Sequence, residues 1–233
     1  MTLNAHPPVS GSSPHWLLKI QVLLALLFLQ LSLASPPSEI ILQTCDEDSL
    51  RAAIVQGGIV RIGCDGVIPL TTEILVRKDL LLTAEGRSVT ISGQDQTRLF
   101  NLSNVTAEFR NITFANGHHQ GTHARFITND SVLESVAQDG FGGALVITNS
   151  TATFVTCTFR MNCAEGGHGA LHTYTDGTTL LSPSRFGYGG AVFSQDSSLS
   201  FAGCTLSSNE VQAGRSAAAS FGWGWTSGGA IHA

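Results

Sequence analysis

The sequence predicts an all-β protein of the right-handed parallel β-helix class, a solenoid of about five coils. The first observation is a phrase that recurs three times, beginning at Phe109, Phe154 and Phe201, which lie 45 and 47 residues apart. The second is a Gly-Gly-Ala motif at 142–144, 189–191 and 228–230, in phase with the phrase. The third is the short, alternating, Thr-, Val- and Ile-rich character of these segments, which is typical of strands. Such self-similarity indicates repeats that bury their apolar faces against one another.

Residues 1–34 are predicted to be a signal peptide. An apolar run at 20–34 follows Lys19 and ends in the small residues that a signal peptidase reads. An uncleaved signal anchor is the alternative, although the run is short for a membrane span of about 20 residues. No second transmembrane segment is expected. The chain is therefore expected to be secreted or held at the cell surface.

Residues 35–58 are predicted to hold a short capping helix. Asp46 or Asp48 suits the N-cap, and Leu50, Ala53 and Ile54 share one side of a helix from 46 to 55. Such a helix would cover the open edge of the first coil. Cys45 and Cys64 flank it, so we expect a disulfide between them. With five cysteines in the chain, at least one thiol stays outside any internal disulfide.

The solenoid itself is assigned to residues 59–233. Turn signals separate strand candidates at 59–62, 67–70, 74–76, 80–83, 89–91 and 99–102, which make about two coils. In the next repeat, strands are expected at 144–148, 151–155 and 157–160. The glycine-rich stretches 117–141, 164–188 and 211–227 are interpreted as long loops that leave the coils at one corner.

Equivalent residues of successive coils should stack in columns, and these columns are interpreted as structural rather than catalytic. Asparagine tolerates turn geometry and can hydrogen-bond to an asparagine in the next coil. The expected columns are Phe109, Phe154 and Phe201; Ile112, Cys157 and Cys204; Phe114, Phe159 and Leu206; and Asn116, Asn162 and Asn209.

Composition excludes one class of partner. Only 12% of the residues are charged and the net charge is −5, without a cluster of Lys and Arg that could neutralise phosphates, so nucleic acid is not an expected partner. Sequons for N-linked glycosylation occur at five asparagines, and they matter only in a host that glycosylates exported proteins. These asparagines are Asn101, Asn104, Asn111, Asn129 and Asn149.

The motifs support a resemblance. The pairing of Gly142-Gly143-Ala144-Leu145 with Phe159-Arg160-Met161-Asn162 resembles the repeats of chlamydial-type polymorphic outer membrane proteins. Residues 45–116 are similar to the first coils of secreted proteins of the pectin-lyase-like superfamily. The resemblance covers about residues 45–233 and implies an adhesive passenger, secreted or on the cell surface, which is the outer membrane in a bacterium. Because a new unit opens at Gly228 and then stops, the solenoid is expected to be truncated there.

A non-catalytic binding, adhesion or structural role is the favoured function, with an extracellular glycan or a surface protein as partner and no cofactor. The alternative is a carbohydrate-active enzyme, a polysaccharide lyase or hydrolase, since the pectin-lyase-like fold hosts both. A hydrolase needs two carboxylates at a defined separation. The carboxylates here are scattered, at Asp95, Asp130, Glu134, Asp139, Glu165, Asp176 and Asp196.

Two groups are candidate binding residues. Trp223 and Trp225 in the third loop suit stacking on a sugar or burial in a partner, or they fold over the last coil. Histidines in the first two loops are metal-ligand candidates, because imidazole suits zinc or copper. The alternative for this second group is a set of flexible polar loops. The histidines are His118, His119, His123, His168 and His172.

Overall fold

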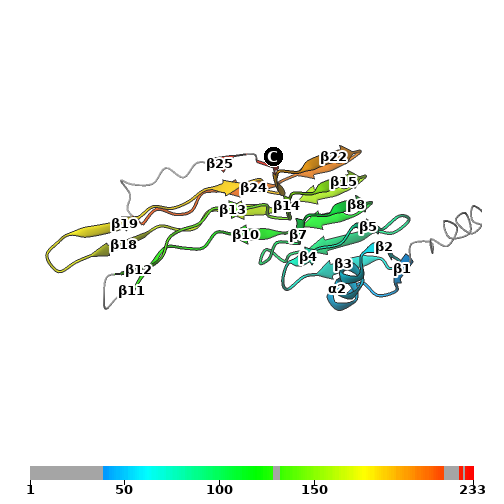
Figure 1. Cartoon of the computed structure of the whole chain (residues 1–233), viewed down its shortest axis with the longest axis horizontal. Coiled ribbons are helices and arrows are strands. Elements are labelled where there is room, and N and C mark those ends of the chain that lie inside the picture. The colour runs from blue at the N-terminus through cyan, green and yellow to red at the C-terminus, as the bar shows by residue number, and fades with distance from the viewer. Residues whose placement is uncertain (1–38, 128–131, 218–225, 228) are drawn as a thin grey trace, which may run out of the picture. The chain divides into compact units, whose positions relative to one another are not determined.

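A computed structural model describes residues 39–127, 132–217, 226–227 and 229–233. These residues belong to one compact unit, Glu39–Ala233. The described part is mostly β, with parallel sheets and one helix, which confirms the all-β class (Figure 1). The signal peptide expected at 1–34 lies outside the described residues.

The one helix of the described part, α2 (Glu47–Gln56), lies where the sequence predicts a short helix. The Asp46 carboxylate accepts a hydrogen bond from the Ser49 N–H at 2.8 Å, as expected of an N-cap. Leu50, Ala53 and Ile54 are buried, which confirms the predicted apolar side. The predicted disulfide is also present, with Cys45 and Cys64 joined over a Cα–Cα distance of 5.7 Å.

Three sheets carry the repeats, and every neighbouring pair within them is parallel. The first sheet has the order β1 (Glu39–Leu42), β2 (Gly58–Ile62), β5 (Leu80–Thr83), β8 (Thr106–Arg110), β15 (Thr151–Val155) and β22 (Ser198–Ala202). The second has β3 (Gly66–Pro69), β6 (Val89–Ser92), β9 (Thr113–Ala115), β16 (Thr158–Arg160) and β23 (Thr205–Ser207). The third has β4 (Ile74–Val76), β7 (Phe100–Ser103), β14 (Leu145–Thr148), β21 (Val192–Gln195) and β26 (Ile231–His232). The chain thus passes through the three sheets in the same order five times.

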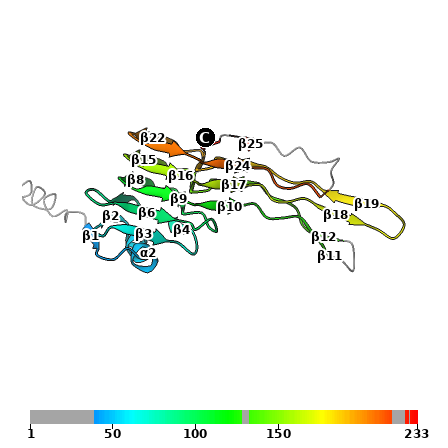
Figure 2. The same cartoon turned by 180° about the vertical axis from the view of Figure 1, so that it is seen from behind.

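The long loops contain more regular structure than the sequence indicated. Two small parallel sheets run through them. One consists of β10 (His118–Gln120), β17 (Cys163–Glu165) and β24 (Glu210–Gln212). The other consists of β13 (Gly140–Phe141), β20 (Gly187–Tyr188) and β25 (Thr226–Ser227). Two antiparallel hairpins also form, β11 (Arg125–Ile127) with β12 (Val132–Ser135), and β18 (Ala170–Thr173) with β19 (Thr179–Ser182) (Figure 2). The stretches 117–141 and 164–188, interpreted from the sequence as long loops, therefore also contain strands. Their strands are short, and their hydrogen-bonding partners lie in the neighbouring repeat for the two parallel sheets and in the same repeat for the two hairpins.

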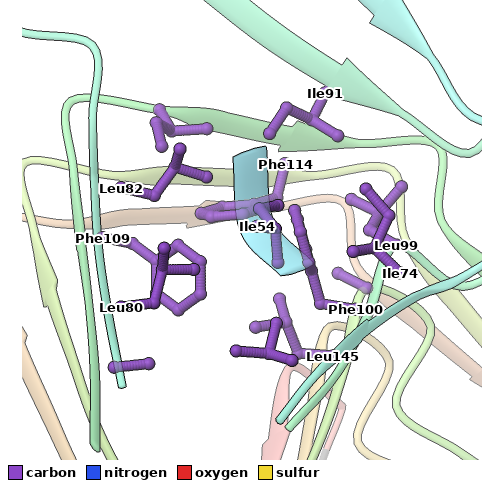
Figure 3. Close-up of a cluster of buried hydrophobic side chains, with 14 of the residues drawn as sticks. Ile54, Ile74, Leu80, Leu82, Ile91, Leu99, Phe100, Phe109, Phe114 and Leu145 are labelled. Carbon is purple, nitrogen blue, oxygen red and sulfur yellow. The ribbon is translucent and has the colours of Figure 1, made fainter. Parts of the chain in front are cut away.

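The core lies between the three sheets and is filled by the predicted columns. Phe109, Phe154 and Phe201 stack with ring centroids 5.3 and 4.9 Å apart, and Phe114 stacks on Phe159 at 4.8 Å. Figure 3 shows Phe100, Phe109 and Phe114 among the aliphatic side chains of this core. Each buried side chain of this size contributes about 1.5–3 kcal/mol.

The alternation of inward- and outward-facing side chains along the chain is interrupted at each corner between the first and second sheets. Phe154 and Phe159 are both buried, although simple alternation over five residues would place them on opposite faces. Thr156 lies between β15 and β16 with a φ of 53°, in the left-handed region, and this turn resets the direction of the side chains. Asn111 and Gly203 have the same backbone conformation at the equivalent corners.

One predicted column was wrong in its alignment. Ala115 pairs with Arg160, so Gly117, not Asn116, is the residue level with Asn162. Asn162 is fully buried; its amide oxygen accepts from the Gly117 N–H at 2.8 Å and its Nδ2 donates to Asn209 Oδ1 at 2.8 Å. The asparagine column therefore consists of Asn162 and Asn209, whereas Asn116 occupies the preceding left-handed turn with a φ of 51°.

Candidate functional site

The third sheet presents a column of half-buried side chains on its outer face. In register along this column lie Asn101 of β7, Val146 of β14, Phe193 of β21 and His232 of β26. The neighbours in sequence of Asn101, Val146 and Phe193 are buried, because side chains alternate across a strand.

A second column stands beside the first. Phe141 of β13 pairs with Tyr188 of β20, and both side chains are half-buried. Each aromatic ring directly precedes a Gly-Gly-Ala motif, so the same backbone turn presents it in each repeat.

The two columns meet in a continuous cluster of rings, here called the aromatic strip, consisting of Phe141, Tyr188, Phe193 and His232. Phe141 lies 4.6 Å from Phe193 and 5.5 Å from Tyr188 between ring centroids. His232 stacks on Phe193 at 5.6 Å and meets Tyr188 at 5.1 Å. The strip spans three successive repeats, so ring faces and edges repeat at the spacing of the strands, about 4.8 Å.

A hollow of about 670 Å³ adjoins the start of the strip. Its volume falls in the range of pockets that take small ligands. Its lining combines apolar and polar groups: Arg98, Asn101, His119, Val136, Ala137, Gln138, Asp139, Phe141, Val146 and Arg185.

Arg98 holds the backbone beneath this hollow. Its side chain is only 8% exposed and forms an ion pair with Glu73 at 3.0 Å. Its Nε donates to the Gly142 carbonyl at 3.0 Å and its Nη2 to the Phe141 carbonyl at 2.8 Å. Burial lowers the pKa of Arg98, and the Glu73 carboxylate opposes that shift. Arg98 therefore acts chiefly by positioning the turn that carries Phe141.

His119 fixes the same turn from the other side. Its Nδ1 accepts the Phe141 N–H at 3.0 Å, so the neutral ring carries its proton on Nε2. Burial lowers the pKa of His119 to about 3, with further lowering by Arg98 and His118. The imidazole is consequently neutral at physiological pH.

The neutral state of His119 gives a stability prediction. A histidine whose pKa is depressed by folding stabilises the protein above its unfolded pKa near 6.5, and that stabilisation is lost as pH falls toward the folded value. The variant His119→Asn keeps an acceptor at the Nδ1 position. Between pH 6.5 and pH 5, we expect its unfolding free energy to fall by about 2 kcal/mol less than that of the wild-type protein. Urea unfolding of both proteins across this range measures it. Parallel curves for wild type and variant would contradict the neutral, buried histidine.

Besides Arg98, the hollow is lined by the charged side chains of Asp139 and Arg185. One Asp139 oxygen accepts the Phe186 N–H at 2.9 Å, and Arg185 Nε donates to the Ala137 carbonyl at 3.2 Å. Burial, followed by the nearby Asp139, raises the pKa of Tyr188, so its hydroxyl remains a hydrogen-bond donor. The hollow thus offers donors and acceptors next to ring faces.

The hollow and the strip offer a ligand two kinds of contact. Among the described residues that line the hollow, Asp139 is the one carboxylate, whereas a glycosidase needs two. Sugars present apolar faces that pack on aromatic rings and hydroxyls that hydrogen-bond at the rim. The strip and the hollow together provide both kinds of contact.

The candidate metal ligands are only partly brought together. His118 and His168 both face Glu165, with Nε2 to carboxylate distances of 3.6 and 3.8 Å. His123 stacks on His168 at 4.2 Å, and His172 lies near Phe126 of the first hairpin.

Hydrogen bonds limit which of these rings could bind a metal. His123 Nδ1 accepts the His168 N–H, and His168 Nδ1 accepts the Arg215 N–H. Their neutral rings therefore carry a proton on Nε2, as His119 does, and have no lone pair left for a metal. Burial, then His123, lowers the pKa of His168. Within the described ranges, no three His, Cys, Asp or Glu side chains are grouped to hold a metal ion, and the metal site stays a sequence-based hypothesis.

The structure does not describe Trp223 and Trp225, so the predicted aromatic contact in the third loop lies outside the described residues. Sequence reasoning missed Phe141, Tyr188 and Phe193. The available signal was an aromatic residue directly before two of the Gly-Gly-Ala motifs.

The remaining cysteines belong to the framework. Cys157 and Cys204 donate to the Phe109 and Phe154 carbonyls of the preceding repeat, at 3.4 and 3.3 Å. Burial raises the pKa of Cys157 and of Cys163 to about 11, which keeps both as thiols. These contacts agree with the structural role predicted for the Cys157 and Cys204 column.

Comparison of the chain with family models, with curated proteins and with solved structures yields no match. Within the described residues, no helix has the length and apolar character needed to cross a membrane.

Proposed function

We propose that the chain is a right-handed parallel β-helix, secreted or exposed at the cell surface, that binds an extracellular glycan without cleaving it. The aromatic strip beside the hollow carries this proposal, because ring faces and polar groups occur together on one face of the repeats. The apolar run at 20–34 supports export.

The β-helix assignment rests on the strand order. Five successive passes of the chain through the same three parallel sheets support a solenoid path. The strong preference of parallel β crossovers for right-handed connections supports the proposed hand. The N-terminal helix and disulfide close one end of the stack, as expected of a solenoid cap.

The proposal predicts retention of the purified protein on one or more members of a panel of immobilised polysaccharides. Replacing Phe193 with Ala should weaken binding about tenfold, since an aromatic contact contributes about 0.5–1.5 kcal/mol and tenfold corresponds to ~1.4 kcal/mol. Phe126→Ala is the matched control, because this half-buried ring lies on β11 and outside the strip.

The same assay separates the alternatives when chain length is followed together with retention. Shortening of a polysaccharide would favour the carbohydrate-active enzyme over a binding protein. Absence of both retention and shortening would favour a protein partner or a structural role. Equal losses in Phe193→Ala and Phe126→Ala would show that the strip is not the binding face.

A further inference from the structure

The sequons of this chain occupy very different environments, and the structure separates them. Asn104 and Asn149 are exposed and stand one above the other, since Ser103 pairs with Thr148 immediately before them. Both have left-handed backbones, with φ of 57° and 48°, at the tight corner between the third and first sheets. Asp196 continues the column in the next repeat with a φ of 51°.

Space is available at this corner. Asn104 and Asn149 line a hollow of about 680 Å³ together with Asp79, Asp196 and hydroxyl side chains. The Asn104 amide nitrogen donates to the neighbouring Ser103 hydroxyl at 2.9 Å, a local and exposed contact. A sugar on either asparagine nitrogen would point into this open, polar corner.

Asn111 is held differently. Its Nδ2 donates to the Ala84 carbonyl at 2.8 Å and to the Arg87 carbonyl at 3.1 Å, which ties the corner to the preceding repeat. An N-linked sugar replaces one of the two hydrogens on that nitrogen, so both bonds cannot persist. Because native proteins keep such groups paired, a glycan here opposes the fold.

Asn101 is unsuited for another reason. It lies within β7, between Leu75 and Val146 on the outer face of the third sheet. Its amide oxygen accepts from Arg77 at 3.2 Å, and its side chain lines the 670 Å³ hollow beside the aromatic strip. A glycan at Asn101 would fill the proposed binding site.

We infer that Asn104 and Asn149 form a modification site for N-linked oligosaccharides, while Asn101 and Asn111 remain unmodified in the folded protein. The inference rests on the export part of the proposed function and is independent of the ligand. It assigns the glycan to the corner between the third and first sheets, whose asparagines line the 680 Å³ hollow and not the 670 Å³ hollow beside the aromatic strip.

The test is secretion of the full chain from an insect or mammalian cell line, with Asn129 changed to Gln to remove the sequon that the structure does not describe. Enzymatic release of N-glycans in heavy-oxygen water marks each formerly glycosylated asparagine for peptide mapping. Label at Asn104, Asn149 or both, with none at Asn101 and Asn111, is expected. Label at Asn111 or Asn101, or an unlabelled secreted protein, would overturn the assignment.

Three matched variants strengthen the test. Asn104→Asp and Asn149→Asp copy the residue that Asp196 supplies at the same corner. The variant of each asparagine that carries label should lose one glycosidase-sensitive gel shift, and its melting temperature should stay unchanged. Asn111→Asp should leave the gel shifts unchanged and lower the melting temperature, because a carboxylate cannot donate to the two carbonyls. Unchanged gel shifts in Asn104→Asp and Asn149→Asp, together with a lost gel shift in Asn111→Asp, would overturn the inference. Protein that stays inside the cell would instead contradict the export on which the proposed function depends.

Discussion

Replacing Gly143 with Ala is expected to destabilise the protein by about 4 kcal/mol or more, an effect in the exceptional range for one substitution. A Cβ at Gly143 would lie 2.3 Å from the Gly190 carbonyl oxygen and 2.5 Å from the Cys163 backbone nitrogen. Both are backbone atoms held by hydrogen bonds to a neighbouring repeat, so they cannot move aside as a flexible side chain would. Equilibrium unfolding in urea, followed by circular dichroism, measures the loss.

Gly229→Ala provides the control for this experiment. Gly229 is the second glycine of the third Gly-Gly-Ala motif, yet a Cβ there has no heavy atom within 4 Å. We expect its unfolding free energy to change by less than about 1 kcal/mol. Similar losses in the two variants would show that the motif acts through backbone flexibility and not through the close approach of neighbouring repeats.

Replacing Asn162 with Ala should cost about 3–5 kcal/mol, because it leaves buried groups without partners. Asn162 is fully buried and its amide oxygen accepts the Gly117 N–H. Its nitrogen donates to the Phe114 carbonyl at 3.1 Å and to Asn209. The same denaturation experiment measures the loss.

The variant Asn116→Ala separates the buried hydrogen bonds of Asn162 from a general need for asparagine at the turn. Asn116 is half-buried, and its nitrogen makes a 3.3 Å contact with the Ser92 hydroxyl. Its replacement should cost about 1–2 kcal/mol, mainly through the left-handed backbone. If Asn116→Ala proved as damaging as Asn162→Ala, the reassigned column would be wrong.

Most strands between 59 and 160 were predictable, because alternation and turn residues are local signals. The predicted segments 74–76 and 80–83 coincide with β4 and β5. The capping helix was equally accessible, since Asp46 and the apolar side of the helix lie within ten residues of one another. The disulfide followed from the positions of Cys45 and Cys64 around that helix.

The hairpins and the asparagine column were not accessible in the same way. β18 and β19 hold few strand-forming residues, and their regularity comes from pairing with each other. Asn116 and Asn162 both end the repeated phrase, but Asn116 lies seven residues after Phe109 (116 minus 109), whereas Asn162 lies eight after Phe154 (162 minus 154). Only the pairing of Ala115 with Arg160 shows that Gly117 is level with Asn162.

The candidate site depended on tertiary structure even more strongly. Phe141 and Phe193 are 52 positions apart in the chain (193 minus 141), and their rings meet because parallel pairing places two repeats side by side. Arg98 reaches the Phe141 and Gly142 carbonyls across a whole repeat. No spacing in the sequence reports such contacts, since they depend on which strands become neighbours.

The sequence by itself determined the period of the repeats, the β class, the capped N-terminal end and the apolar columns of the core. Those properties follow from local side-chain patterns and from the burial of apolar residues at each repeat. The tertiary structure alone decided the aromatic strip, the neutral state of His119 and the different environments of the sequons. Each of these depends on the register between repeats, which places a side chain beside a partner more than 20 residues away in the chain.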